Sequence, residues 1–202
     1  MARDKIVAGP CGIYVAARGT AKPTPAPSLD LENLPTTLLT NWSLLAAGDY
    51  GSAVENNFSE SKNDVRGLND TYKLKKFRSE EGILYSTTLL DLLPDTLAYG
   101  FDNQDVETTM PASGVAGYQE LDFERGFNVV EHAILVVGMA PFALTDPNDA
   151  IMVFWHPAVD IEAPGSFNRN LADPTMPALM ADVIKHETLG VGGLVANNAD
   201  PL

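Results

Sequence analysis

The sequence TYKLKKFRSEEGILYSTTLLDLLPDTLAYGFDN, residues 71–103, decides the fold of this chain. In residues 71–78, apolar and polar side chains alternate, which is the spacing of a β-strand. Residues 83–90 are rich in β-branched and aromatic side chains, and glycine and acidic residues bound them, so a second strand is expected there. The intervening Ser-Glu-Glu-Gly at 79–82 predicts a turn between the two strands.

Residues 91–103 have the spacing of a helix, with Leu93, Leu97 and Phe101 on one side. Pro94 is compatible with a helix when it lies in the first turn, where its missing N–H has no intrahelical partner anyway. The centre of the chain therefore reads as strand, turn, strand and helix, and it carries no catalytic signature.

The charge of the chain excludes several classes of partner. The 202 residues carry a formal net charge of −14, and 45% of them are hydrophobic, which is enough for a core of normal size. Such a charge disfavours binding to nucleic acid or to an anionic membrane surface by charge attraction. Cys11 is the only cysteine, so no internal disulfide is expected and a cytosolic origin fits. Neither a signal peptide nor an apolar run of membrane-spanning length is apparent.

The basic residues are concentrated in one segment. Six of the thirteen lysines and arginines lie between residues 62 and 78. They are Lys62, Arg66, Lys73, Lys75, Lys76 and Arg78. We expect this cluster to meet an acidic surface, including one on another copy of the chain. A solvated charged hairpin without a partner is the alternative that the residues leave open.

Before the central stretch, a first strand is expected after Gly9-Pro10 and up to residue 17, because apolar residues alternate there. Residues 18–37 are rich in proline and predict a connector with a polyproline tendency. A buried segment with Trp42 should end at Gly48. The polar residues that follow predict a long loop over 51–81, and loops of this length are usually functional or interfacial.

After the central stretch, residues 106–117 are polar, and residues 118–125 predict a strand. Glu120, Asp122 and Glu124 share one face of that strand and are expected to be solvated. Further strands are expected over 127–139, over 150–155 with a continuation at 159–162, and over 179–187, where a helix competes with the strand. Residues 188–202 predict a loose C-terminal arm.

These elements predict one domain over residues 1–202 of the mainly β class, with antiparallel packing and one helix at its side. Strands do not alternate regularly with helices, so a parallel doubly wound sheet is disfavoured.

A search for chemistry gives a single weak candidate. His156, Asp160 and Glu162 have a spacing that could ligate a metal ion, although Pro157 indicates a turn beside the histidine. His132 lies among apolar residues and is expected in the core or an interface. The chain has no nucleophile elbow, P-loop or dinucleotide fingerprint. We therefore expect no metal, no cofactor and no enzymatic activity, and a structural role becomes the leading hypothesis.

The first half of the chain resembles the major tail tube proteins of bacteriophages with long, non-contractile tails. The resemblance rests on Gly12-Ile-Tyr-Val-Ala16, on Gly19-Thr20 followed by Pro23, and on Trp42 followed by Gly48, in that order. The central stretch is similar to the strand, loop, strand and helix of that family, so the pattern covers about residues 6–103. The second half has no matching signature.

The resemblance implies an antiparallel β-sandwich or partly open β-barrel with one flanking helix, a long loop and terminal arms. It implies hexameric rings that stack into a tube, a virion component made in the bacterial cytoplasm and a conduit through which DNA passes into the host without specific binding. Tape measure, tail terminator and distal tail proteins are the implied partners, and no membrane is involved.

In that setting the six basic residues would form a subunit interface, and Glu120, Asp122 and Glu124 would line the lumen, where like charge repels DNA. A tail terminator, a head–tail connector or a decoration protein is the alternative virion role, and a metal-binding β-domain enzyme with His156 as its centre is the remaining one.

Overall fold

The computed structural model describes residues 11–24, 35–48, 54–66, 73–88, 94–102, 106–122, 129–139, 151–162 and 178–196. Within them the chain is mainly β, and every strand pair is antiparallel. The expected fold class is confirmed, and the described strands do not close into a barrel.

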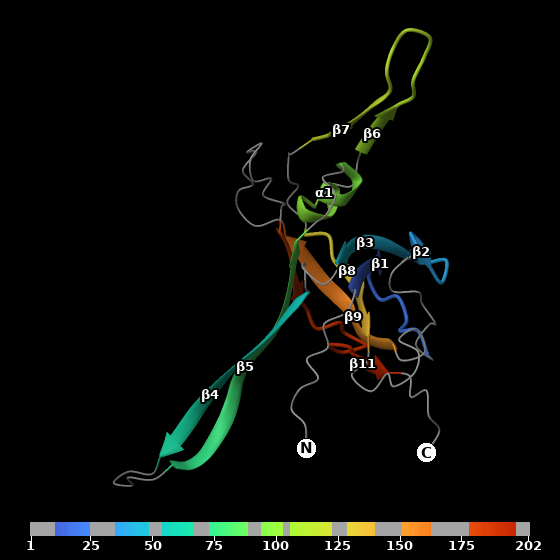
Figure 1. The fold of residues 1–202 in the computed structure, drawn as a ribbon. Coiled ribbons are helices and arrows are strands. Elements are labelled where there is room, and N and C mark those ends of the chain that lie inside the picture. Colours follow the sequence, from blue (N-terminus) through green and yellow to red (C-terminus); the bar gives the residue numbers. More distant parts are fainter. Residues whose placement is uncertain are drawn as a thin grey trace.

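The main sheet contains nine of the described strands in the order β2-β3-β1-β8-β9-β10-β5-β4, with β11 also paired to β9. Their bounds are β1 Cys11–Ala17, β2 Thr37–Leu38, β3 Trp42–Gly48, β4 Glu55–Arg66, β5 Lys73–Thr88, β8 His132–Met139, β9 Ile151–Glu162, β10 Ala178–Val183 and β11 Gly193–Ala196. A separate two-stranded sheet joins β6, Val106–Thr109, to β7, Tyr118–Leu121. Figure 1 shows β4 and β5 leaving the main sheet on one side, while β6 and β7 extend on the other side beyond α1.

The core lies on both faces of the central strands. One cluster contains Ile134 and Val136 of β8 together with Leu45 of β3 and Tyr85 of β5. β3 and β5 are far apart in the strand order, so the sheet must curl for these residues to share a core. The other cluster lies on the opposite face around Leu135. Alternation along β8 explains the division, because successive side chains point to opposite faces.

β9 contains a β-bulge. Because of it, the odd-numbered residues of β9 face one core cluster before the bulge and the other cluster after it. His132 lies opposite Val159 and Ile134 opposite His156, so β9 has one extra residue between these pairs, at Pro157 and Ala158. A proline suits this place because it has no N–H to donate to the sheet. Before the bulge the odd-numbered residues belong to the Leu135 cluster, whereas Val159 belongs to the Ile134 cluster.

The predicted helix is confirmed as α1, Pro94–Gly100. Pro94 occupies its first position, which requires no N–H donor. Leu97 is buried in the Ile134 cluster and Phe101 packs against it, as the helical spacing predicted. Leu93 lies outside the described residues. The helix covers one face of the curled sheet.

The predicted turn at 79–82 is wrong, because β5 runs without interruption from Lys73 to Thr88. Gly82 lies inside this strand, opposite Ser59 of β4. A Cβ atom on Gly82 would lie 2.7 Å from the Ser59 Oγ atom. The glycine therefore permits a close approach between the two strands. Since glycine is also typical of turns, the sequence alone does not distinguish the two roles.

The long loop expected over 51–81 is also wrong where the structure describes it. Residues 55–66 form β4, which pairs with β5 along its whole length. Polar and charged residues predicted a loop, but a ribbon that is exposed on both faces has the same composition.

The expected strand over 118–125 is shorter than predicted. β7 ends at Leu121, and its partner β6 comes from the segment that was interpreted as a polar stretch. The strand expected over 127–139 begins at His132 as β8. Its predicted partner is confirmed as β9, which also continues through Pro157 to Glu162.

The C-terminal part is better ordered than its composition predicted. The strand expected over 179–187 is present as β10, but it ends at residue 183. The loose arm expected from residue 188 is wrong for residues 193–196, because β11 pairs with β9. The described part of the 18–37 connector also contacts the sheet. Gly19 N donates to Pro157 O at 2.8 Å, and Trp155 Nε1 donates to Thr20 O at 3.0 Å.

Candidate assembly surfaces

The most unusual surface is the arm, which we define as residues 58–66 of β4 and the residues 73–83 of β5 that pair with them. Figure 1 shows it as a long ribbon that leaves the body of the protein. Every residue from 55 to 64 is exposed, and Phe58 retains 63% of its accessible surface. A two-stranded ribbon without a covered face is marginally stable in water. The arm therefore has the properties of a segment that packs against another molecule.

Pairing of β4 with β5 brings the six basic residues together at the far part of the arm. Lys62 lies opposite Arg78, and Arg66 lies opposite Lys73. Like charges in directly opposite positions destabilise a sheet, so a solitary arm gains little from this arrangement. Lys62 Nζ lies 2.5 Å from Glu60 Oε2, and Lys76 is exposed. We call Lys62, Arg66, Lys73, Lys75, Lys76 and Arg78 the basic cluster.

A small cavity of about 300 Å³ lies where the arm joins the body. Phe58 and Ile83 of the arm line it together with Val183 and Val191. Val191 is 46% exposed, so apolar surface continues from the arm onto the body. Exposed apolar surface of this kind is typical of a contact between proteins.

The β6–β7 hairpin is a second exposed projection. Glu107 and Glu120 lie directly opposite each other, and both are exposed. Asp122 follows the end of β7 and is also exposed, whereas Glu124 lies outside the described residues. Of the three acids predicted to share a strand face, only Glu120 therefore lies on a described strand. Met110, beyond the end of β6, is 76% exposed.

A third surface is acidic and lies on β9 and β10. Asp160 is directly opposite Asp182, and Glu162 is two residues further along β9. We call Asp160, Glu162 and Asp182 the acidic face. Glu162 and Asp182 are exposed. Partial burial raises the pKa of the Asp160 carboxyl above its ordinary value. The negative charges of four neighbouring carboxylates raise this pKa further, and these carboxylates are those of Asp102, Glu162, Asp182 and Glu131.

The structure separates the residues of the candidate metal site. His156 lies before the β9 bulge and Asp160 after it, so the two side chains belong to opposite faces of the sheet. His156 is buried, with its Nδ1 2.6 Å from Val191 O and its Nε2 2.7 Å from Tyr85 Oη. Nδ1 donates to the carbonyl, so Nε2 accepts the tyrosine proton. Burial lowers the pKa of His156, and both ring nitrogens are occupied by structural contacts.

Among the described residues, no three histidine, cysteine or acidic side chains are grouped as a metal site would require. His132 is a core residue, as one of its predicted interpretations stated. Its ring meets the edge of Tyr99 at a centroid distance of 5.2 Å, and burial lowers its pKa.

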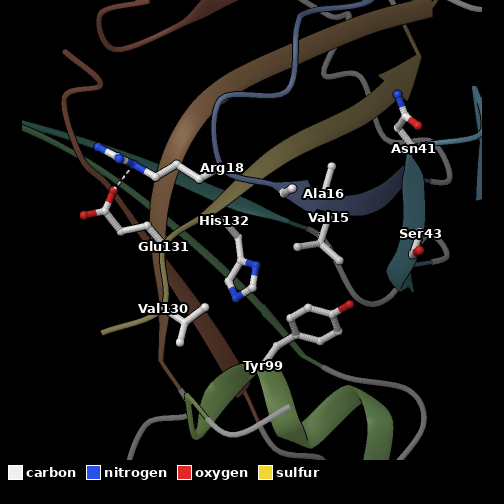
Figure 2. A pocket seen from close by; sticks show the side chains of 10 residues that line it. Val15, Ala16, Arg18, Asn41, Ser43, Tyr99, Val130, Glu131 and His132 are labelled. Atoms are coloured by element: carbon white, nitrogen blue, oxygen red, sulfur yellow. Dashed lines mark ion pairs between the residues drawn. The ribbon is translucent and has the colours of Figure 1, made fainter. Parts of the chain in front are cut away.

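A cavity of about 390 Å³ lies beside His132, between the end of β1, the start of β3 and α1. Figure 2 shows Tyr99 reaching from α1 toward the His132 ring, with the Arg18–Glu131 ion pair on the left of the view. Arg18 Nε lies 2.5 Å from Glu131 Oε2, and Arg18 Nη2 lies 2.8 Å from Glu187 Oε1. Arg18 thereby joins the connector to Glu131, which directly precedes β8, and to Glu187 of the C-terminal segment, which is a structural role.

The sequence identified the basic cluster but missed the acidic face as a surface. The sequence pattern points to Asp160 and Glu162 only as metal ligands beside His156, and it contains no signal for Asp182. The neighbours of Asp160 depend on the β9–β10 pairing and on the bulge. No local pattern in the sequence contains this information.

Comparison with known families agrees with the resemblance seen in the sequence. Residues 2–174 match the model of the family described as phage tail tube protein. The match covers more than half of the chain, so this chain belongs to the phage tail tube protein family and is a component of the virion tail.

A curated relative supports the assignment over a shorter segment. The chain is 36% identical over 81 residues to the major tail protein Gp23 of Mycobacterium phage L5. The aligned segment covers 39% of this chain and 41% of the relative. In the part of the chain that the structure describes, no helix is long and apolar enough to cross a membrane.

Proposed function

We propose that this chain is a major tail tube subunit whose copies form hexameric rings, and that the rings stack into the conduit for viral DNA ejection. The observation that carries the proposal is the arm, which is exposed on both faces and extends the sheet beyond the body of the protein. A neighbouring copy would cover one of these faces. The role is structural and requires no catalytic activity.

The contact that the arm makes is heterologous, because the arm of one copy meets a different surface on the next copy. Contacts of this type generate closed rings or open helical assemblies, depending on the rotation between copies. A tube of stacked rings contains both arrangements, because the copies within a ring form a closed assembly and the stacked rings form an open one. The basic cluster supplies the interface residues of the arm. Tape measure, tail terminator and distal tail proteins are the further partners that we propose for the assembled tube.

We also propose that Glu120, Asp122 and Glu124 face the lumen. The support is the exposure of Glu120 and Asp122 and the position of Glu107 opposite Glu120. Carboxylates that stay solvated and negatively charged repel the phosphates of DNA, so DNA passes without binding.

The test is negative-stain electron microscopy of the purified chain over a range of protein and salt concentrations. We expect open-ended tubes with a regular axial repeat. The matched variant replaces residues 62–79 by Asn-Gly, which closes the ribbon after Ser61 with a two-residue hairpin loop. We expect this arm-shortened variant to keep the unfolding transition of the body and to form no tubes.

Two results would overturn the proposal. Wild-type protein that forms only single rings at every concentration would assign it to a terminator or connector role. Tubes from the arm-shortened variant, as abundant as those of the wild type, would show that the arm does not carry the assembly.

A further inference from the structure

We propose that the basic cluster of one copy docks on the acidic face of a neighbouring copy. This inference rests on the proposed function and adds to it the surface that receives the arm. The occupant of the acidic face is therefore a second copy of this chain. The argument uses the charge distribution of the arm, the environment of Asp160 and a comparison with the other acidic surface.

The charge of the arm changes along its length. Residues 61–78 contain the six cations of the basic cluster and only two acids, Asp64 and Asp70. Nearer the body the pairing places Glu60 opposite Glu81, so the basic part is confined to the far part of the arm. An arm with this charge distribution binds most favourably to a partner whose negative charges are grouped on one surface. The basic cluster accounts for nearly half of all lysines and arginines in the chain.

The acidic face has the complementary arrangement. Asp160 and Asp182 are opposite each other on adjacent strands, which is an unfavourable pairing in the isolated subunit. Among the described residues, no hydrogen-bond donor reaches the buried Oδ1 atom of Asp160. A lysine or arginine of a neighbour that pairs with the exposed Asp182 would place a positive charge beside Asp160 and reduce the repulsion between the two aspartates.

The β6–β7 hairpin is the other acidic surface that could receive the arm. Its Glu107 and Glu120 are exposed on a projecting hairpin, where water solvates each carboxylate. Asp160 is instead partly buried among four other carboxylates. A docked cation therefore relieves more repulsion at the acidic face than on the hairpin. This difference selects the acidic face as the docking surface and leaves the hairpin acids charged.

Charge reversal in the full-length chain tests the contact. We expect Lys76→Glu and Asp182→Lys each to raise the protein concentration required for tube formation about tenfold at roughly 0.15 M salt. We expect the double variant to return within about threefold of the wild type, because it restores opposite charges across the contact. Lys185→Glu is the matched control, since Lys185 is exposed, lies outside the arm and makes the same change of charge. We expect it to assemble as the wild type does.

Asp160→Asn gives an independent test, because we expect it to change the stability of the subunit and its assembly in opposite directions. Removing this charge relieves repulsion within the subunit, so we expect the unassembled protein to unfold at a higher temperature while it assembles less readily. A residue with a purely structural role would shift both quantities in the same direction. Asp160→Asn that stabilises the subunit and also promotes assembly would overturn the proposal.

The outcomes also separate this inference from the proposed function. Wild-type protein that forms no tubes contradicts the proposed function itself. Tubes that form normally with Lys76→Glu, or rescue of Lys76→Glu by Glu120→Lys but not by Asp182→Lys, would overturn the docking on the acidic face and leave the tube function standing.

Discussion

The centre of the main sheet and the arm have the same backbone hydrogen-bonding pattern but opposite environments. In β8, Ile134 and Leu135 have no accessible surface although they point to opposite faces. In β4, the residues from 55 to 64 are exposed whichever way they point. Burial of apolar side chains stabilises the centre, whereas strand pairing and exposed contacts such as the Lys62–Glu60 ion pair hold the arm. The comparison teaches that one antiparallel sheet combines a self-sufficient core with an exposed extension, which in our proposal a neighbouring copy covers.

The largest expected difference between the two regions comes from truncating a side chain in each. Leu135→Ala removes packing at a fully buried position and should lower the free energy of unfolding by about 3 kcal/mol. Phe58→Ala, on the exposed arm, should change it by no more than about 0.5 kcal/mol. Urea unfolding of unassembled protein measures both. Equal losses for the two variants would mean that the arm belongs to the cooperative core.

A smaller effect is expected where the C-terminal segment joins the core. Gly192 has φ +94°, and a Cβ there would lie 2.0 Å from Trp155 O, whereas a Cβ on Gly193 would meet no atom within 4 Å. Gly192→Ala should therefore destabilise the protein by about 2 kcal/mol, and Gly193→Ala should have little effect. Thermal unfolding of the two variants side by side checks this expectation. A neutral Gly192→Ala would remove β11 from the stable part of the fold.

The smallest effect concerns pH and again separates the core from the arm. Burial lowers the pKa of His132 and of His156 below the ordinary value of 6.5. The unfolded chain then binds protons at a higher pH than the folded chain, so stability is complete above pH 6.5 and declines as pH falls below it. Each histidine contributes at most about 1.4 kcal/mol per pH unit.

Asp160 acts in the opposite direction, because its pKa is raised above 3.8 and its protonation at low pH stabilises the folded subunit. The measurement is urea unfolding between pH 7 and pH 5.5 for the wild type and for the arm-shortened variant. We expect the same loss in both, since both histidines lie in the core. A loss that disappears with the arm would place the titrating groups there.

Much of the fold could be predicted from the sequence because local pattern and burial agree in the centre. The apolar residues of β8 and β9 predicted buried partner strands, and Pro94 with Leu97 predicted the helix correctly. The arm was harder, because an exposed ribbon and a polar loop have the same composition. The glycine at position 82 predicts a turn, whereas in the structure it permits a close approach between two strands.

Of the two candidate surfaces, one could be predicted from the sequence and the other could not. The basic cluster is contiguous in the sequence and was therefore visible in the distribution of charge. The acidic face depends on the pairing of β9 with β10 and on the bulge at Pro157, which also separates His156 from Asp160. Such long-range pairing is set by the whole sheet, and a short window of sequence cannot reveal it.

The most direct test of the central claim is hydrogen exchange of the backbone amides in the unassembled subunit and in purified tubes. In the subunit we expect slow exchange in β8 and fast exchange in β4, which forms the uncovered edge of the sheet. In tubes we expect the amides of the arm to become protected, while those of β8 stay unchanged. An arm that exchanges equally fast in both states would contradict the claim that it is built to pack against a neighbour.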